Sequence, residues 1–150
     1  MKIYIGADHR GFKLKEELKT WLGGLGHEVI DRGNTILDPE DDFPDFANAT
    51  AEAVANDQKS VGILMCGSGS GMALAANKHK GVYAVVASDE DALYTNGGWG
   101  INLLAFPADK IILDHARKII LNWFNNQDKI KDSYQRRLGK IIATENKNFK

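Results

Sequence analysis

The sequence has little of several features that would assign it to particular classes of protein. One cysteine in 150 residues excludes an internal disulfide framework. The formal net charge of -1 is too small to attract nucleic acid or an anionic membrane. The longest apolar runs, such as residues 82–87, are too short to span a bilayer, and the N-terminus lacks the pattern of a signal peptide. We therefore expect a cytoplasmic protein that has neither a membrane nor a nucleic acid as its partner.

What is present is an ordinary globular composition with regular alternation of short apolar segments and helical patterns. The segments predicted as strands are residues 2–7, 28–32, 61–66, 82–87 and 102–106. Helical spacing of apolar residues is found over residues 12–25, from Pro44, from the glycine-rich turn to about Lys78, and in two patterns near 111–123 and 130–147. This alternation predicts one domain over residues 1–150, with an α/β fold: a doubly wound five-stranded parallel sheet flanked by helices on both faces.

Ligands of such sheets bind beyond the carboxyl ends of the strands, where the strand order reverses. The first predicted strand ends in Asp8-His9 and the third ends in Cys66-Gly67. If the strand order is 2-1-3-4-5, these two ends are neighbours at the reversal. An acid, an imidazole and a thiol from two separate segments would then meet in one crevice.

The loop after Cys66 alternates glycine with serine: Gly67, Ser68, Gly69, Ser70, Gly71. Glycine permits positive φ angles and a close approach of the backbone, and the following helix directs free N–H groups at the same place. The loop could therefore cradle a phosphate or a developing oxyanion, or it could simply be a tight turn between strand and helix.

Three candidate side chains have alternative explanations. A single cysteine is commonly a small buried hydrophobe, but a thiol at a strand end that faces a helix N-terminus gains thiolate character. Asp8 could cap the helix that begins near Gly11. His9 follows a strand end, where side chains are exposed. No histidines have the spacing of metal ligands, and no Cys–His cluster exists in the sequence, so we expect no metal or cofactor.

Several segments together resemble the type B ribose-5-phosphate isomerases and the related galactose-6-phosphate isomerase subunits. The matching stretches are GADHRGFKLK (6–15), HEVIDRG (27–33), DDFPDFA (41–47), GILMCGSGSGMALAANK (62–78), NLLAF (102–106) and QRRLGKI (135–141). The resemblance covers nearly the whole chain. It implies a Rossmann-like fold, a sugar-phosphate substrate, and a homodimer or larger even assembly that shares active-site residues between subunits.

The resemblance also implies an aldose–ketose isomerisation through a cis-enediolate, without a metal. Cys66 would be the base, and the hydroxyl of Ser68 would relay a proton between the two oxygens. Backbone N–H groups of the loop (Gly67, Gly69, Ser70 and Gly71) would stabilise the enediolate. Asp8 would bind sugar hydroxyls, His9 and Arg137 would contact the phosphate, and Trp99 and Asn102 would border the substrate.

The sequence departs from the family pattern at several of these positions. Where the family has His-Asn-Asp-x-Asn, this chain has Gly98, Trp99, Gly100, Ile101 and Asn102. The ring-opening histidine is thus replaced by Gly98. Two expected phosphate-binding arginines align with Asp109 and Ser133, and Phe43 replaces a usual tyrosine. These changes predict altered specificity, for an open-chain, shorter or differently charged sugar derivative, or a loss of activity.

Two other functions are compatible with the sequence. One is a non-catalytic sugar-binding subunit, or one half of a heteromeric isomerase. The other is a dinucleotide-binding oxidoreductase domain, but that fingerprint requires G-x-G-x-x-G in the first strand–helix turn, and this chain has G-x-G-x-G in the third. The helix predicted at 130–147 has no strand after it. Its apolar stripe would pack on its own domain or, as we expect, at a dimer interface.

Overall fold

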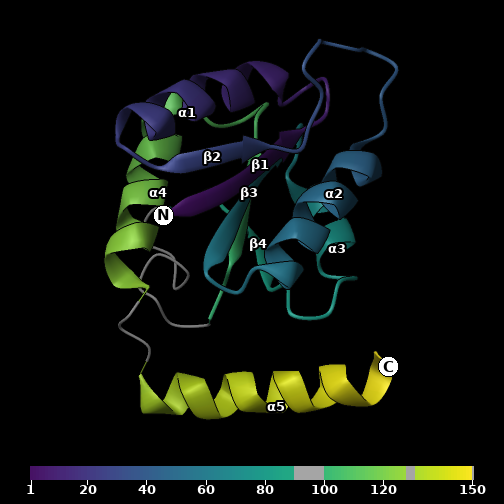
Figure 1. Ribbon diagram of the computed structural model, residues 1–150, viewed down its shortest axis with the longest axis vertical. Helices are drawn as coiled ribbons and strands as arrows, with labels where there is room; N and C mark the ends of the chain where they lie inside the picture. Colours follow the sequence, from purple (N-terminus) through teal and green to yellow (C-terminus); the bar gives the residue numbers. More distant parts are fainter. Residues whose placement is uncertain (90–99, 128–130, 150) are drawn as a thin grey trace.

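The computed structural model describes residues 1–89, 100–127 and 131–149. Its elements follow the predicted alternation of strands and helices (Figure 1). In chain order they are β1 (Lys2–Ala7), α1 (Phe12–Gly24), β2 (Glu28–Asp31), α2 (Phe43–Asn56), β3 (Ser60–Cys66), α3 (Ser70–Ala76), β4 (Ala84–Val86), β5 (Leu103–Pro107), α4 (Leu113–Asn126) and α5 (Asp132–Asn148). The predicted α/β fold with a five-stranded parallel sheet is confirmed.

The strands are arranged in the order β2-β1-β3-β5-β4, and every pairing is parallel. β1 and β3 are therefore neighbours, as the predicted reversal point requires. The last two strands are interchanged relative to the order 2-1-3-4-5: β5 pairs with β3, and β4 lies at the edge. Burial accounts for the exchange, because all five residues of β5 are buried whereas two of the three in β4 are only partly so.

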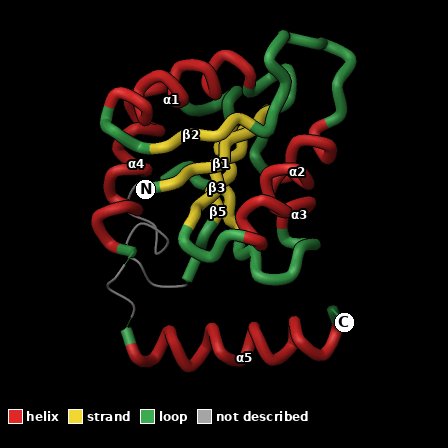
Figure 2. Tube along the Cα trace, viewed as in Figure 1, coloured by secondary structure: helices red, strands yellow, loops and turns green. Residues whose placement is uncertain are grey.

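Side chains that alternate along the strands divide the core into two layers (Figures 1 and 2). One layer lies between the sheet and the helices α1 and α4, and it includes Ile5, Ile63 and Trp123. The other lies between the sheet and the helices α2 and α3, and it includes Leu64 and Cys66. Because residues 64 and 66 point the same way along a strand, the thiol belongs to the α2–α3 side of the sheet.

The observed boundaries differ from the predicted ones by at most about three residues, and the local chemistry explains one difference. α2 begins at Phe43, so that Pro44 stands in its first turn, where the missing N–H group has no helical partner to lose. The long connection from β2 to α2 arches over one end of the sheet (Figure 2).

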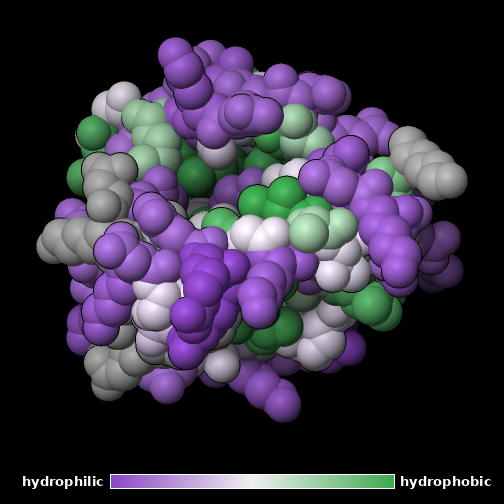
Figure 3. Space-filling view, turned by 90° about the horizontal axis from the view of Figure 1, so that it is seen from below, coloured by the Kyte–Doolittle hydropathy of each residue, from purple (hydrophilic) through white to green (hydrophobic). Residues whose placement is uncertain are grey.

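The final helix, α5, lies apart from the other helices, below the sheet in Figure 1. None of its residues is buried, although Ile142 and Leu138 are partly covered. Seen from below, this end of the molecule is mostly hydrophilic with exposed apolar patches among the polar atoms (Figure 3). Among the helices of the described residues, none is both long and apolar enough to cross a membrane.

Candidate active site

Four segments meet at the edge of the sheet formed by the carboxyl ends of β1, β3 and β5. They are the turn after β1, the glycine loop after β3, the residues after β5, and the start of α2. Backbone hydrogen bonds join the first three: Asp8 N donates to Met65 O at 3.3 Å, and Asp109 N donates to Gly67 O at 3.1 Å. The sequence argument expected two of these segments to be neighbours, and the structure adds the other two.

Asp8 is held inside the turn after β1. It is 6% exposed, and its Oδ1 accepts hydrogen bonds from the backbone N–H groups of Arg10 at 3.0 Å and Gly11 at 3.1 Å. Burial raises the pKa of this carboxyl, and the two N–H groups oppose the rise. The explanation of Asp8 as a helix cap is wrong: the N-cap of α1 is Gly11 without a side-chain cap, and Asp8 Oδ1 stabilises the turn before the helix instead. No hydrogen bond of its Oδ2 occurs among the described residues.

Cys66 ends β3 with its side chain buried, and the loop folds back over the sulfur. Gly69 N donates to Cys66 Sγ at 3.2 Å. This contact needs Gly69 in the left-handed region (φ 75°), where a Cβ would stand 2.9 Å from Ala105 O. The hydroxyl of Ser68 is exposed beside it and accepts a bond from Ser70 N at 3.3 Å.

An ion pair lies across the glycine loop. The guanidinium of Arg10 pairs with both carboxylate oxygens of Asp109, and a Cβ on Gly67 would stand 2.9 Å from each of these side chains. Asp109 occupies the position where the resemblance predicts an arginine. The cation at this place therefore comes from the turn after β1, and an acid from the β5 segment neutralises it.

The start of α2 closes another side of the loop. A Cβ on Gly71 would stand 2.8 Å from the ring of Phe43, so only glycine allows the ring to lie this close to the backbone. Phe43, in the usual tyrosine position, thus presents an apolar ring without a hydroxyl to the glycine loop.

His9 is bonded to a residue of the β2–α2 connection. Asp41 Oδ1 accepts from His9 N at 3.0 Å and from His9 Nδ1 at 2.7 Å. The hydrogen bond to Asp41 raises the pKa of the imidazole, and the charge of Asp8 adds to the rise. His9 therefore lies at this end of the sheet with its charged form favoured by two carboxylates, Asp41 and Asp8.

Two predicted site residues lie elsewhere in the same chain. Asn102 precedes β5, where its amide donates to Gly81 O and accepts from Tyr83 N, both at 2.8 Å. Arg137 is exposed on α5, and α5 contacts Gly81 and Gly100 through Glu145 and Leu138. These contacts are at the amino ends of β4 and β5, the opposite edge from Cys66. The structure therefore does not bring Asn102 or Arg137 to the glycine loop of the same chain. Trp99 and Gly98 lie outside the described residues.

Three polar residues at or behind this edge were not singled out from the sequence: Arg10, Asp41 and Lys15. Arg10 and Asp41 fall inside stretches that carry the resemblance, but residue type alone gave no partner for either. The burial of Lys15 could have been predicted from the sequence, because Lys15 lies three and seven residues before Leu18 and Leu22 on the apolar stripe of α1. In the structure its side chain is fully buried.

Comparisons with known proteins agree with the resemblance in the sequence. The model of the Ribose/Galactose Isomerase family matches residues 3–141. Ribose-5-phosphate isomerase B of Escherichia coli (strain K12) is 39% identical over 145 residues, which cover 96% of this chain and 96% of that protein. The 4-deoxy-4-sulfo-D-erythrose isomerase of Clostridium sp. (strain MSTE9) is 41% identical over 112 residues, which cover 66% and 69%.

A solved structure gives the same answer for the fold. Ribose-5-phosphate isomerase B from Mycoplasma genitalium, with bound ribulose-5-phosphate, superposes with a TM-score of 0.88 at 32% identity and covers 97% of this chain and 96% of that one. With the glycine loop after β3, the turn after β1 and these matches over nearly the full length, the chain belongs to the ribose/galactose isomerase family of aldose–ketose isomerases.

Proposed function

We propose that this chain isomerises an open-chain sugar that carries an anionic end group, with Cys66 as the base. The observation that carries the proposal is the bond from Gly69 N to Cys66 Sγ, made in a loop that lies against the turn of Asp8. It supports Cys66 as the base, because the sulfur accepts a backbone N–H group of the glycine loop and ends the strand beside the one that leads to the buried carboxyl of Asp8.

The reaction conserves all atoms of the substrate. The Cys66 thiolate takes the proton from the carbon next to the carbonyl, and the electron pair moves to form a carbon–carbon double bond and an oxyanion. Backbone N–H groups of the glycine loop stabilise that oxyanion. Ser68 passes a proton from the neighbouring hydroxyl to the oxyanion, and the Cys66 thiol returns its proton to the former carbonyl carbon. The carbonyl has then moved by one carbon.

The negative charge of Asp109 favours a substrate whose anionic group carries less charge than a phosphate monoester. A phosphate monoester carries about −1.5 to −2 charges at pH 7, and Asp109 repels it where an arginine would attract it. Arg10 is already paired with Asp109. A sulfonate carries a single charge, and one relative is named for a sulfonated four-carbon sugar.

The missing ring-opening histidine favours four-carbon sugars, whether their end group is a sulfonate or a phosphate. Glycine, which this chain has at position 98, can neither donate nor accept a side-chain proton. A four-carbon aldose whose terminal oxygen is phosphorylated, or replaced by a sulfonate, cannot close a furanose ring and needs no opening. Ribose 5-phosphate is mostly cyclic, and binding only its scarce open form lowers the apparent affinity by that fraction.

The active site would be completed by a second copy of the chain. α5 carries Arg137 at the opposite edge of the sheet and has no buried residue of its own. A homodimer would cover its apolar stripe and would bring Arg137 to the anionic end of the partner's substrate. The cytoplasmic location expected from the sequence is part of the same proposal.

The test is a comparison of kcat/KM for 4-deoxy-4-sulfo-D-erythrose, erythrose 4-phosphate and ribose 5-phosphate. We expect the four-carbon substrates to be preferred, and the double variant Gly98→His, Trp99→Asn to gain on ribose 5-phosphate. A wild-type preference for the pentose, or a restored motif that gains nothing, would contradict the argument from Gly98. Inactivity on every sugar would instead favour a non-catalytic sugar-binding subunit.

A further inference from the structure

A buried ammonium group lies behind the candidate active site. Lys15, on α1, is fully buried, and a charge removed from water must be paired. Its Nζ donates to Asp31 Oδ2 at 2.8 Å and to the backbone oxygen of Asn34. Although burial opposes the change, the bonds from Lys15 and Lys19 hold the pKa of Asp31 below its usual value. Lys15 thereby fixes the start of the β2–α2 connection against α1.

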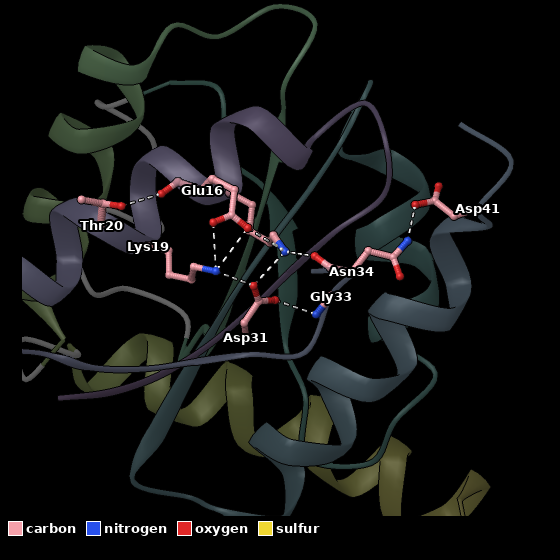
Figure 4. Close-up of polar contacts among 8 residues, drawn as sticks. Glu16, Lys19, Thr20, Asp31, Gly33, Asn34 and Asp41 are labelled. Carbon is pink, nitrogen blue, oxygen red and sulfur yellow. Dashed lines mark hydrogen bonds and ion pairs between the residues drawn. The ribbon is translucent and has the colours of Figure 1, made fainter. Parts of the chain in front are cut away.

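A hydrogen bond within the β2–α2 connection joins Asn34 to Asp41. Asn34 Nδ2 donates to Asp41 Oδ2 at 2.9 Å, so that the two ends of the segment between them are held together (Figure 4). The side chain of Asp41 is only 5% exposed. Its other oxygen, Oδ1, receives both bonds from His9. A continuous chain of contacts therefore runs from Lys15 through Asn34 and Asp41 to the imidazole.

The geometry fixes which ring nitrogen of His9 carries the proton. An ionised carboxylate only accepts hydrogen bonds, so Nδ1 must be the donor to Asp41. The nitrogen left for a substrate is Nε2, which is a donor when the ring is charged. The other charged groups near the ring are Asp8, which favours the imidazolium, and Arg10, which disfavours it and is itself paired with Asp109.

We propose that Asp41, held by Asn34 and Lys15, is a positioning residue that accepts the Nδ1 proton of His9 and so orients the charged ring to donate from Nε2 to the anionic end of the substrate. This rests on the proposed function of the site, but the bond between Asp41 and His9 can be measured without any substrate. No catalytic step is assigned to Asp41 itself.

The first arm of the test is an NMR titration of the His9 ring in the full chain. In the wild type the ring should titrate above the ordinary value of about 6.5, with Nδ1 protonated in the neutral form. Asp41→Asn should lower the pKa and mix the tautomers. Asp38→Asn is the matched control, because Asp38 belongs to the same connection and, among the described residues, its carboxylate accepts only from Glu40 N, while its backbone oxygen, which accepts from Asp41 N, is kept. Equal titration in the wild type and Asp41→Asn would overturn the proposal.

The second arm is kinetic and uses the best substrate of the panel. Losing a charge-assisted hydrogen bond should raise KM about ten- to a hundredfold with a smaller change in kcat. Because a His9 pKa raised by Asp41 keeps the ring charged to higher pH, the fall of kcat/KM on the alkaline side should begin at lower pH in Asp41→Asn. Asp41→Glu should recover part of the loss. An unchanged KM and pH profile would overturn the proposal.

The hydrogen bond from Asn34 to Asp41 is tested with the variant Asn34→Ala, which removes only that amide bond. Lys15→Met is less suitable, because it would leave the carboxylate of Asp31 without its buried partner. We expect Asn34→Ala to lower the His9 pKa by less than Asp41→Asn, and to raise KM in proportion. A normal titration in Asn34→Ala would overturn the part assigned to Asn34. If no sugar reacts, the proposed function fails, while the NMR arm still decides whether Asp41 fixes His9.

Discussion

The two ends of the sheet are built differently; we call them the carboxyl edge, where the strands finish, and the amino edge, where they begin. At the carboxyl edge, four segments are held together by backbone bonds and buried polar side chains, with Asp8 and Cys66 inside them. At the amino edge, α5 is attached through contacts such as those of Glu145 and Leu138 and buries none of its residues. The difference supports the proposal that one chain supplies Asp8 and Cys66, and that a second chain would cover α5 and complete the site with its Arg137.

The carboxyl edge should be the most sensitive to a change of one atom. Replacing Cys66 by alanine removes the proposed base, and should lower kcat at least about a hundredfold, the scale of positioned acid–base catalysis. The fold should persist, because Gly69 keeps its left-handed conformation without the sulfur. Steady-state kinetics together with circular dichroism measures both. Turnover near the wild-type level would remove Cys66 from its role.

The amino edge should act only between chains. Arg137→Ala should raise KM about ten- to a hundredfold by removing a charged donor to the anion, whereas Arg136→Ala, the exposed neighbour, should not. Light scattering should give at least twice the monomer mass of 16.5 kDa.

Mixing these two impaired variants, assayed at substrate concentrations well below KM, sharpens this prediction. When subunits of Cys66→Ala and Arg137→Ala exchange in equal amounts, half of the dimers are mixed and each has one intact site. Activity should rise to about a quarter of the wild-type value. A monomer in solution, or no recovery after proven exchange, would contradict a site shared between chains.

Asp109 tests how far the carboxyl edge sets specificity. Asp109→Asn leaves the guanidinium of Arg10 without its partner and removes a repulsive charge, so kcat/KM for erythrose 4-phosphate should rise about tenfold relative to the sulfonate substrate. The pair is exposed, and its loss should cost less than about 1 kcal/mol of stability. Asp114→Asn, which breaks another exposed ion pair on α4, is the control. A shift of the same size in both variants would remove the specific role of Asp109.

The reactive pair could be predicted from the sequence because parallel strands end at a common edge. That rule, together with an assumed strand order in which the first and third strands adjoin, made Asp8 and Cys66 neighbours, and the pairing of β1 with β3 confirms their strands as such. The order of β4 and β5 could not be predicted in this way, since both segments are short and apolar and only the burial in the folded chain separates them. The position of Arg137 was equally out of reach, because a helical stripe does not say which edge of a sheet it meets.

The contacts of Arg10 and Asp41 show a second limit. Charged residues of surface loops outnumber the partners that a sequence can assign to them, and here the partner of each is far along the chain: Asp109 for Arg10, and His9 for Asp41. Such pairings are decided by how the connections fold over the sheet. Local patterns carry no information about them.

The smallest effect is expected at Asn102, where the amino edge offers a matched pair of variants. Asn102 bonds Gly81 O and Tyr83 N, and Asn77 makes the same two kinds of bond with the backbone of Ala84, all at 2.8 Å. Because the amide nitrogen and oxygen of Asn102, and those of Asn77, are hydrogen-bonded within the chain, Asn102→Ala and Asn77→Ala should each lose about 1–3 kcal/mol of unfolding free energy.

Neither variant should change KM by more than about twofold, which is less than the loss of one ordinary hydrogen bond to a substrate. Urea unfolding and steady-state kinetics on the same preparations separate the two quantities. If Asn102→Ala raised KM about tenfold while Asn77→Ala did not, the amide of Asn102 would have a substrate role besides its structural one. Asn102 would then be assigned, with Arg137, to the part of the proposed site that a second chain would supply.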